Sequence, residues 1–159
     1  MSDDVKPDSS APAPRTINPP HYFVLSLLAM GLLRWLIDTP PLLGPIAWIG
    51  LAPILAGVAV ALRAAGQFAK AGTNIVPLTR STALVTDGMF ARSRNPMYTS
   101  MVAVVIGVAL VLDRAAPWVV VAVFVAILRL RFIRHEERLM EATFGQAYVD
   151  YKARVRRWL

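Results

Sequence analysis

The sequence predicts an all-α integral membrane protein with four transmembrane helices, a cytoplasmic segment between the second and third helices, and a C-terminal amphipathic helix. Of its 159 residues, 56% are hydrophobic and only 17% are charged, whereas about 25% are charged in an ordinary soluble domain. The mean hydropathy is +0.51. A chain of this length forms one domain, and one core cannot bury so many apolar residues. The excess must face lipid or a partner, which excludes a soluble enzyme.

The first 20 residues predict a disordered tail, because they combine five prolines with serines and aspartates. We do not expect the tail to be a signal peptide, since its start is acidic and no small-residue cleavage site follows the first apolar run. Residues 21–159 are therefore expected to form a single transmembrane domain.

Four apolar stretches predict the membrane spans. They cover residues 22–37, 42–62, 97–112 and 115–128, and the last continues through a more basic turn to residue 133. A spanning helix needs roughly 17–25 residues, so these are short spans. Residues 38–41 and 113–114 join them as tight outer turns, which Asp and Pro favour.

The positions of the basic residues predict the orientation of the spans. Of the 17 Lys and Arg residues, 15 lie in the tail, in the segment 63–96 or after residue 128, and the opposite turns contain only Arg114. The positive-inside rule then places both termini and the segment 63–96 in the cytoplasm. In a bacterium the protein would be a multi-pass protein of the cell inner membrane.

Composition argues against metal sites and against nucleic acid as a partner. The chain has no cysteine and two histidines, so we expect neither a thiolate nor a histidine metal site. The formal charge is +7, but the basic residues flank apolar runs. That placement suits a membrane surface better than nucleic acid, and the bilayer is the expected partner.

Glutamates follow the fourth span. At about 100° per residue, Glu136 lies near the middle of an apolar face, and Arg129 lies within about 20° of it. Glu136 therefore either neutralises a bound cation or pairs with Arg129 or another arginine. Glu137 lies at the edge of this face, where a solvated ion pair with Arg134 is favoured. The other residues of the face are Phe132, Ile133, Leu139, Met140 and Thr143.

The third span begins with a polar motif. Asn95 followed by Pro96 is a helix-start signal in which Asn95 caps the first amides. A helix N-terminus with Arg94 beside it is also a ready anion site. Upstream, residues 82–90 predict an extended piece and an Asp-Gly turn, which could fold back over a site between the third and fourth spans.

These motifs, taken together, resemble the isoprenylcysteine carboxyl methyltransferase and phospholipid methyltransferase superfamily. The matching runs are LVTDGMF at 84–90, RNPMY at 94–98, EERL at 136–139 and FGQAYVDY at 144–151. They occur in the family's order and spacing over about residues 73–158, which would be the cofactor-binding core. The resemblance implies an integral membrane enzyme that uses S-adenosylmethionine and releases S-adenosylhomocysteine.

The resemblance also implies site residues. Those expected to bind the cofactor are Ala83, Leu84, Val85, Phe90, Asn95, Pro96, Met97, Tyr98 and Glu136. Asn95 replaces the family's usual histidine and cannot shuttle a proton. Phe132 stands where the prenylcysteine enzymes place an arginine, for which Arg129, Arg131 or Arg134 could substitute. The residues expected to handle substrate or protons are Arg94, Glu137 and Arg131.

The reaction expected from the resemblance is in-line methyl transfer to a lipid-borne or small hydrophobic acceptor. Alternatives are a phospholipid amine N-methyltransferase, a membrane reductase that uses a nicotinamide cofactor, and a non-catalytic four-helix membrane protein. A transporter is disfavoured, because the first three spans contain no acidic residue in their interiors. The acceptor and the oligomeric state are left open.

The C-terminus predicts one more element. Tyr148, Tyr151, Val155 and Trp158 form an apolar helical stripe flanked by basic residues. This pattern favours an amphipathic helix on anionic lipid, which could also roof the site.

Overall fold

The computed structural model describes residues 18–70 and 83–158, and within these ranges every regular element is helical. The helices are α1 (Pro19–Leu36), η1 (Gly44–Gly50), α2 (Leu51–Lys70), α3 (Pro96–Leu112), α4 (Ala116–Ile127), η2 (Leu128–Ile133), α5 (Arg134–Phe144) and α6 (Gln146–Arg154). The tail predicted for residues 1–20 lies largely outside the described residues. Its last two prolines instead begin α1, because proline is tolerated in the first turn of a helix.

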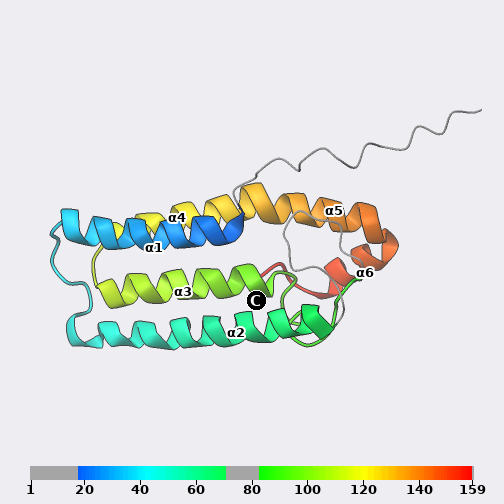
Figure 1. The fold of residues 1–159 in the computed structure, drawn as a ribbon, viewed down its shortest axis with the longest axis horizontal. Helices are drawn as coiled ribbons and strands as arrows, with labels where there is room; N and C mark the ends of the chain where they lie inside the picture. Colours follow the sequence, from blue (N-terminus) through cyan, green and yellow to red (C-terminus); the bar gives the residue numbers. More distant parts are fainter. Residues whose placement is uncertain (1–17, 71–82, 159) are drawn as a thin grey trace, which may run out of the picture.

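The long helices form a bundle (Figure 1). α1 packs against α4, and α2 packs almost entirely on α3, which also contacts α1 and α4. Two described helices are long and apolar enough to cross a bilayer, Gly44–Lys70 and Ala116–Phe144, and α3 is a shorter apolar helix. The four-span count stays a prediction.

Close approach of α2 and α3 depends on glycine. A Cβ atom at Gly57 would lie 2.7 Å from the Ser100 carbonyl oxygen, and one at Gly50 would collide with the Gly107 carbonyl. Small residues at such contacts allow helix backbones to approach closely. These glycines therefore allow η1 and α2 to lie close against α3.

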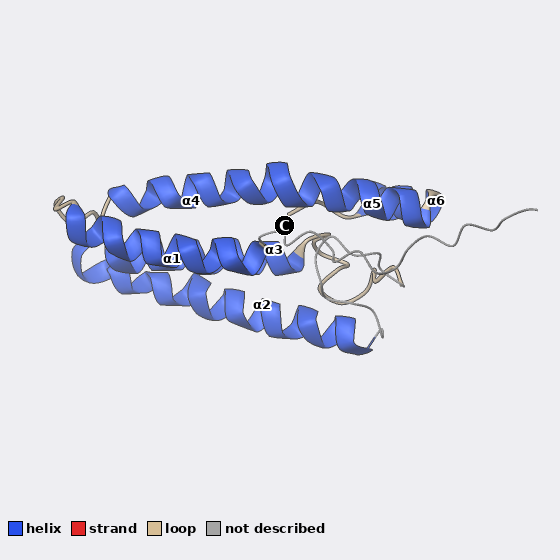
Figure 2. Ribbon diagram, turned by 45° about the horizontal axis from the view of Figure 1, so that its top comes forward, coloured by secondary structure: helices blue, strands red, loops and turns tan. Residues whose placement is uncertain are grey.

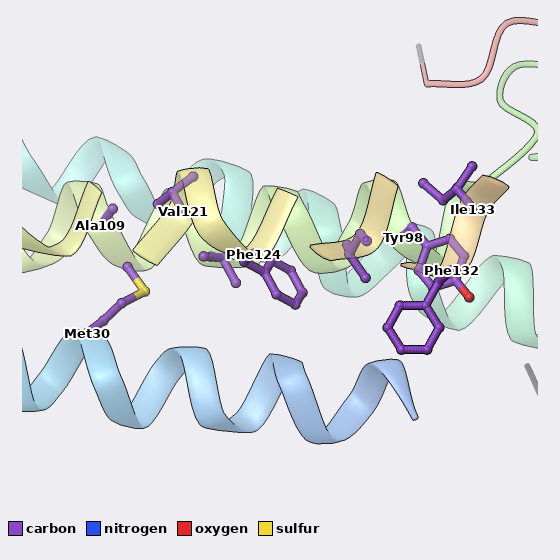
Figure 3. Close-up of a cluster of buried hydrophobic side chains, with 9 residues drawn as sticks. Met30, Tyr98, Ala109, Val121, Phe124, Phe132 and Ile133 are labelled. Atoms are coloured by element: carbon purple, nitrogen blue, oxygen red, sulfur yellow. The ribbon is translucent and has the colours of Figure 1, made fainter. Parts of the chain in front are cut away.

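The core lies where α1, α3 and α4 meet (Figure 3). Figure 3 shows Met30 reaching from α1 towards Ala109 of α3 and Val121 of α4. The outward faces of α1 and α2 are also apolar, and Trp35, Leu55 and Leu62 are 79%, 68% and 70% exposed. So large an exposed apolar surface needs lipid or a partner. The buried cluster is Met30, Tyr98, Val105, Ala109, Val121, Phe124, Leu128, Phe132 and Ile133.

The two ends of the bundle are formed by different segments of the chain. The turn end carries residues 37–43 and 113–115, and the motif end is the opposite one, where α3 begins and α5 and α6 lie. Three tryptophans lie close to these turns in the chain: Trp35 at the end of α1, Trp48 in η1 and Trp118 at the start of α4. Tryptophan is enriched at membrane–water interfaces, so these positions are consistent with an interface at the turn end.

Asp113 holds the turn end together. It ends α3 with a left-handed backbone (φ 55°), and its Oδ atoms accept the amide hydrogens of Leu42, Leu43 and Gly44 at 2.9, 2.6 and 2.9 Å. Desolvation raises the pKa of the Asp113 carboxyl, but the amide hydrogen bonds and the Arg114 charge together hold it below its usual value. One carboxylate thus joins the turn at 113–114 to residues 42–44, which directly follow the turn predicted at 38–41.

A π-helical turn, η2, separates α4 from α5 within one continuous rod (Figure 2). Such a turn adds one residue and rotates everything after it by about 100° relative to an uninterrupted α-helix. The prediction that Glu137 lies at the edge of the inward face is wrong for this reason. Glu137 is buried at 8% exposure, whereas Glu136 is half-buried.

Candidate functional site

The first turn of α3 sits at the centre of the motif end. Pro96 takes the first helical position and Asn95 precedes it, as the sequence predicts. The Asn95 side chain, however, does not cap the helix: its Nδ2 donates to the carbonyl oxygen of Arg157 at 3.0 Å. The cap prediction is wrong because the chain after α6 returns to this turn and offers a carbonyl partner.

Arg94 connects this turn to the C-terminal part of the chain. Its Nη2 donates to Glu137 Oε1 at 2.8 Å and its Nη1 to the Lys152 carbonyl at 2.8 Å. Its backbone N–H donates to the Arg156 carbonyl at 2.9 Å. The side chain is 9% exposed, and its buried Nε has no hydrogen-bond partner among the described residues.

Glu137 lies between two guanidinium groups. It accepts from Arg94 and, in a bidentate arrangement, from Arg157 Nε at 3.0 Å and Nη2 at 2.6 Å. Burial raises the pKa of the Glu137 carboxyl, but the bonds and charges of Arg157 and Arg94 hold it below its usual value. The predicted solvated pair with Arg134 is therefore wrong. A carboxylate held this way is a weak general base.

Glu136 meets a partner that the sequence analysis did not name. The hydroxyl of Tyr98 donates to Glu136 Oε1 at 2.6 Å. Tyr98 is buried at 6% exposure within the α3 face of the core. This bond joins the motif at the start of α3 to the glutamate pair of α5, 38 residues later in the chain.

The predicted Asp-Gly turn forms and is anchored to α2. Gly88 has φ +56°, a left-handed conformation that favours glycine. Gln67 of α2 accepts from the Met89 amide at 2.9 Å and donates to the Asp87 carbonyl at 3.1 Å. The sequence did not indicate Gln67, because a lone glutamine on a helix carries no signal for a distant turn.

Phe90 ends this turn between two elements. Its ring packs edge-on against Phe68 of α2, with centroids 4.8 Å apart. Its carbonyl oxygen accepts the Tyr151 hydroxyl at 2.6 Å. The turn therefore links α2 to α6.

The tyrosines of α6 face the protein. Tyr148 and Tyr151 are each 3% exposed, so the stripe predicted for a lipid surface packs against the motif end instead. Burial, reinforced by the Glu137 charge, raises the pKa of Tyr148 to about 12. After α6, the carbonyl oxygen of Arg157 accepts hydrogen bonds from Asn95 Nδ2 and, at 3.4 Å, from Ser93 Oγ. The C-terminal segment thus covers the start of α3.

The structure brings only some of the predicted site residues together. Those gathered where α3, α5 and the C-terminal segment meet are Arg94, Asn95, Pro96, Tyr98, Glu136 and Glu137. Arg131 is elsewhere: its guanidinium lies over the Tyr22 ring of α1, 5.8 Å from the centroid. Four of the residues predicted to bind the cofactor are half-buried: Ala83, Leu84, Val85 and Met97. No group of three His, Cys, Asp or Glu side chains within residues 18–70 and 83–158 could hold a metal ion.

Comparison with known proteins adds an independent finding. A family model described as phospholipid methyltransferase matches residues 46–147, a range that includes α2 through α5. The chain is also 35% identical, over 63 residues, to a protein of Haemophilus influenzae described as uncharacterized. That alignment covers 40% of this chain and 100% of the relative. No solved structure matches the chain.

Proposed function

We propose, from the premise that this chain belongs to the phospholipid methyltransferase family of integral membrane methyltransferases, that it transfers the methyl group of S-adenosylmethionine to a hydrophobic or lipid-borne acceptor. Membership itself makes the chain a membrane methyltransferase. The methyl donor, the acceptor class and the residues that bind them are the proposal. The reaction domain is residues 21–159, with a cofactor-binding core at about 73–158.

The observation that supports this best is the bond between Tyr98 and Glu136. It brings a half-buried carboxylate of α5 to the first turn of α3, where helix amides favour an anion. S-adenosylmethionine carries a cationic sulfonium and amino group together with a carboxylate. Glu136 suits the cationic part, and the start of α3 beside Asn95 suits the carboxylate.

A second observation concerns Arg94. Its buried Nε lacks a partner among the described residues, and a buried donor without one costs free energy. A polar ligand or acceptor group beside α3 would remove this cost. This donor therefore suits the anionic group of a charged cofactor, just as the Glu136 carboxylate suits its cationic group.

The bound cofactor supplies an electrophilic methyl group, and the chain's residues align and shield the reaction. Glu136 and Tyr98 fix the orientation of the cationic group. Phe90, Tyr148 and Tyr151 are buried around the motif end and exclude water, which strengthens the polar contacts. Glu137 acts as a positioning residue that holds Arg94, since its lowered pKa makes it a weak base.

The acceptor decides whether a base is required. A carboxylate acceptor, as in the isoprenylcysteine enzymes, is already a nucleophile. A phospholipid amine, which the family match favours, must lose a proton before it can be methylated. Glu136 is then the better-placed base, because Glu137 is bound by two arginines. The proposal includes both acceptors, and an assay separates them.

Topology is part of the same proposal. We expect four spans with both termini in the cytoplasm, supported by basic residues near the motif end and by the tryptophans near the turn end. The cofactor would then reach the motif end from the cytoplasm, and a hydrophobic acceptor from the bilayer.

The test is binding of S-adenosylhomocysteine to the detergent-purified full chain by calorimetry. Wild type should bind, Glu136→Gln should lose binding, and Glu141→Gln should bind like wild type, because Glu141 is an exposed partner of Lys152. A nicotinamide cofactor serves as the control ligand. Binding of the nicotinamide cofactor alone would instead support a membrane reductase.

Transfer of labelled methyl from S-adenosylmethionine then identifies the acceptor. Phosphatidylethanolamine and a prenylcysteine are offered separately in vesicles. Label in the amine or in the carboxyl ester distinguishes the two acceptors, and label in neither, with intact cofactor binding, would exclude both.

A further inference from the structure

We propose that a cleft at the motif end of α2 binds the anionic headgroup of a membrane phospholipid, separately from the methyl acceptor. The cleft has a volume of about 510 Å³. Arg63 and Lys70 of α2 line one side, and Arg92 of the turn before α3 lines the other. None of these residues is used by the proposed transfer reaction, so the inference does not depend on it.

The charge of the cleft calls for an anion. Arg63, Lys70 and Arg92 are exposed and form no ion pair with any residue in the described ranges 18–70 and 83–158. The acid nearest to the cleft in sequence is Asp87, which is exposed. The segment 71–82 contains no acidic residue. The cations therefore exceed the acids around the cleft, and an anion relieves their mutual repulsion.

The position of the cleft fits a headgroup rather than a ligand buried in the bilayer. Arg63, Gly66, Gln67 and Lys70 are spaced at i, i+3, i+4 and i+7, so they share one face of α2. Leu62, directly before this stripe, is 70% exposed and belongs to the apolar outer surface. The basic stripe begins where that surface ends, which is the depth of lipid headgroups.

The walls of the cleft also fit the upper part of a lipid. Met89 lines the cleft, and the methylene groups of the Arg63 and Lys70 side chains add apolar surface beside their charged ends. Gly66 has nothing within 4 Å of where a Cβ atom would stand, so the wall stays open there. Basic pockets at the ends of transmembrane helices are a known mode of anionic lipid recognition.

Native mass spectrometry of the detergent-purified full chain tests this inference. The probes are phosphatidylglycerol, phosphatidylcholine and inorganic phosphate, each titrated separately. The cleft variant combines Arg63→Gln, Lys70→Gln and Arg92→Gln. A matched control removes three exposed charges elsewhere, with Arg138→Gln, Arg154→Gln and Arg156→Gln.

We expect phosphatidylglycerol to bind wild type and the control equally, and the cleft variant roughly a hundred-fold more weakly, since each cation near a membrane surface contributes about a factor of five. Equal affinity in the cleft and control variants overturns the proposal. So does phosphatidylcholine binding as tightly as phosphatidylglycerol. Inorganic phosphate binding as tightly as the lipid makes the cleft a free-anion site and also overturns it.

A folding defect is checked separately. If circular dichroism shows that the cleft variant has lost helix, the single variant Arg92→Gln decides. Binding about five-fold weaker than wild type supports the proposal, and unchanged binding overturns it.

Discussion

Each end of the bundle is held by one buried carboxylate, but the two carboxylates bind different partners. At the turn end, Asp113 accepts three backbone amides from residues 42–44. At the motif end, Glu137 accepts from the side chains of Arg94 and Arg157. Backbone amides are present in every residue except proline, so Asp113 needs only the correct loop geometry. Glu137 needs two particular arginines.

The different partners of the two carboxylates set a structural contact at the turn end apart from a candidate binding site at the motif end. Asp113 closes a turn, and its carboxylate is engaged by amides of the chain itself. Buried polar atoms without a partner among the described residues occur at both ends, Thr39 Oγ1 and Arg114 Nε at the turn end and Arg94 Nε at the motif end. At the motif end this donor lies close to a pair of carboxylates on α5. A buried carboxylate therefore marks a candidate site only through the groups that surround it.

The largest effect is expected for Glu137→Gln. The change leaves two guanidiniums without their counter-charge, and removal of one partner from a buried pair costs about 3–5 kcal/mol. We expect α6 and the chain after it to detach and methyl transfer to be lost. Hydrogen exchange of residues 146–158, read by mass spectrometry, measures the detachment.

Glu141→Gln is the matched control for that variant. Its partner Lys152 is 40% exposed, and an exposed pair contributes at most about 1 kcal/mol. Protection of α6 that is equal in both variants would show that Glu137 does not hold the C-terminal segment.

The next largest effect is expected for Tyr98→Phe. This variant keeps the ring in the core and removes the hydroxyl that donates to Glu136. Hydrogen bonds to charged groups contribute about 1.5–3 kcal/mol, so S-adenosylhomocysteine should bind roughly ten-fold more weakly. Calorimetry measures the change, with Tyr22→Phe as the control, because Tyr22 lies at the start of α1. An unchanged affinity would separate the Tyr98–Glu136 bond from the cofactor site.

A smaller and different effect is expected for Asp113→Asn. The amide retains one oxygen acceptor and loses the charge, so the junction with residues 42–44 weakens. The unfolding temperature should fall by less than in Glu137→Gln, while affinity for S-adenosylhomocysteine stays at the wild-type value. Differential scanning fluorimetry and calorimetry give the two readings. A loss of ligand affinity here would contradict the separation of the two ends.

The smallest effect near neutral pH is that of acidification. The pKa values of Glu137 and Asp113 are both held below their usual values of 4.5 and 3.8. Their stabilisation is therefore fully present above these values and is lost as pH falls through the lowered folded-state pKa. We expect amide protection of α6 and of residues 42–44, corrected for intrinsic exchange, to be constant from pH 7 to pH 5 and to decline below pH 4. A decline between pH 7 and pH 6 would point to another titrating group.

Local signals predicted much of the fold. The apolar run at 97–112 corresponds to α3, which begins one residue earlier at Pro96, because proline at the first position and hydrophobicity act within the helix itself. The Asp-Gly turn at 87–88 and the gathering of Arg94, Tyr98 and Glu136 also follow the sequence motifs. The burial of Glu137 does not, because the π-helical turn rotates it inward.

The sequence by itself determined the class of protein, the apolar helices and the polar residues at their ends, since composition and periodicity are properties of the chain. Only the tertiary structure decided which groups meet. The Arg157 side chain donates to Glu137, and the Arg157 carbonyl oxygen accepts from Asn95 Nδ2. Gln67 accepts from the Met89 amide and so anchors the turn. These partners are between 20 and 62 residues apart, and no local pattern encodes them. They are selected because a buried donor or acceptor must find a partner wherever packing brings one within reach.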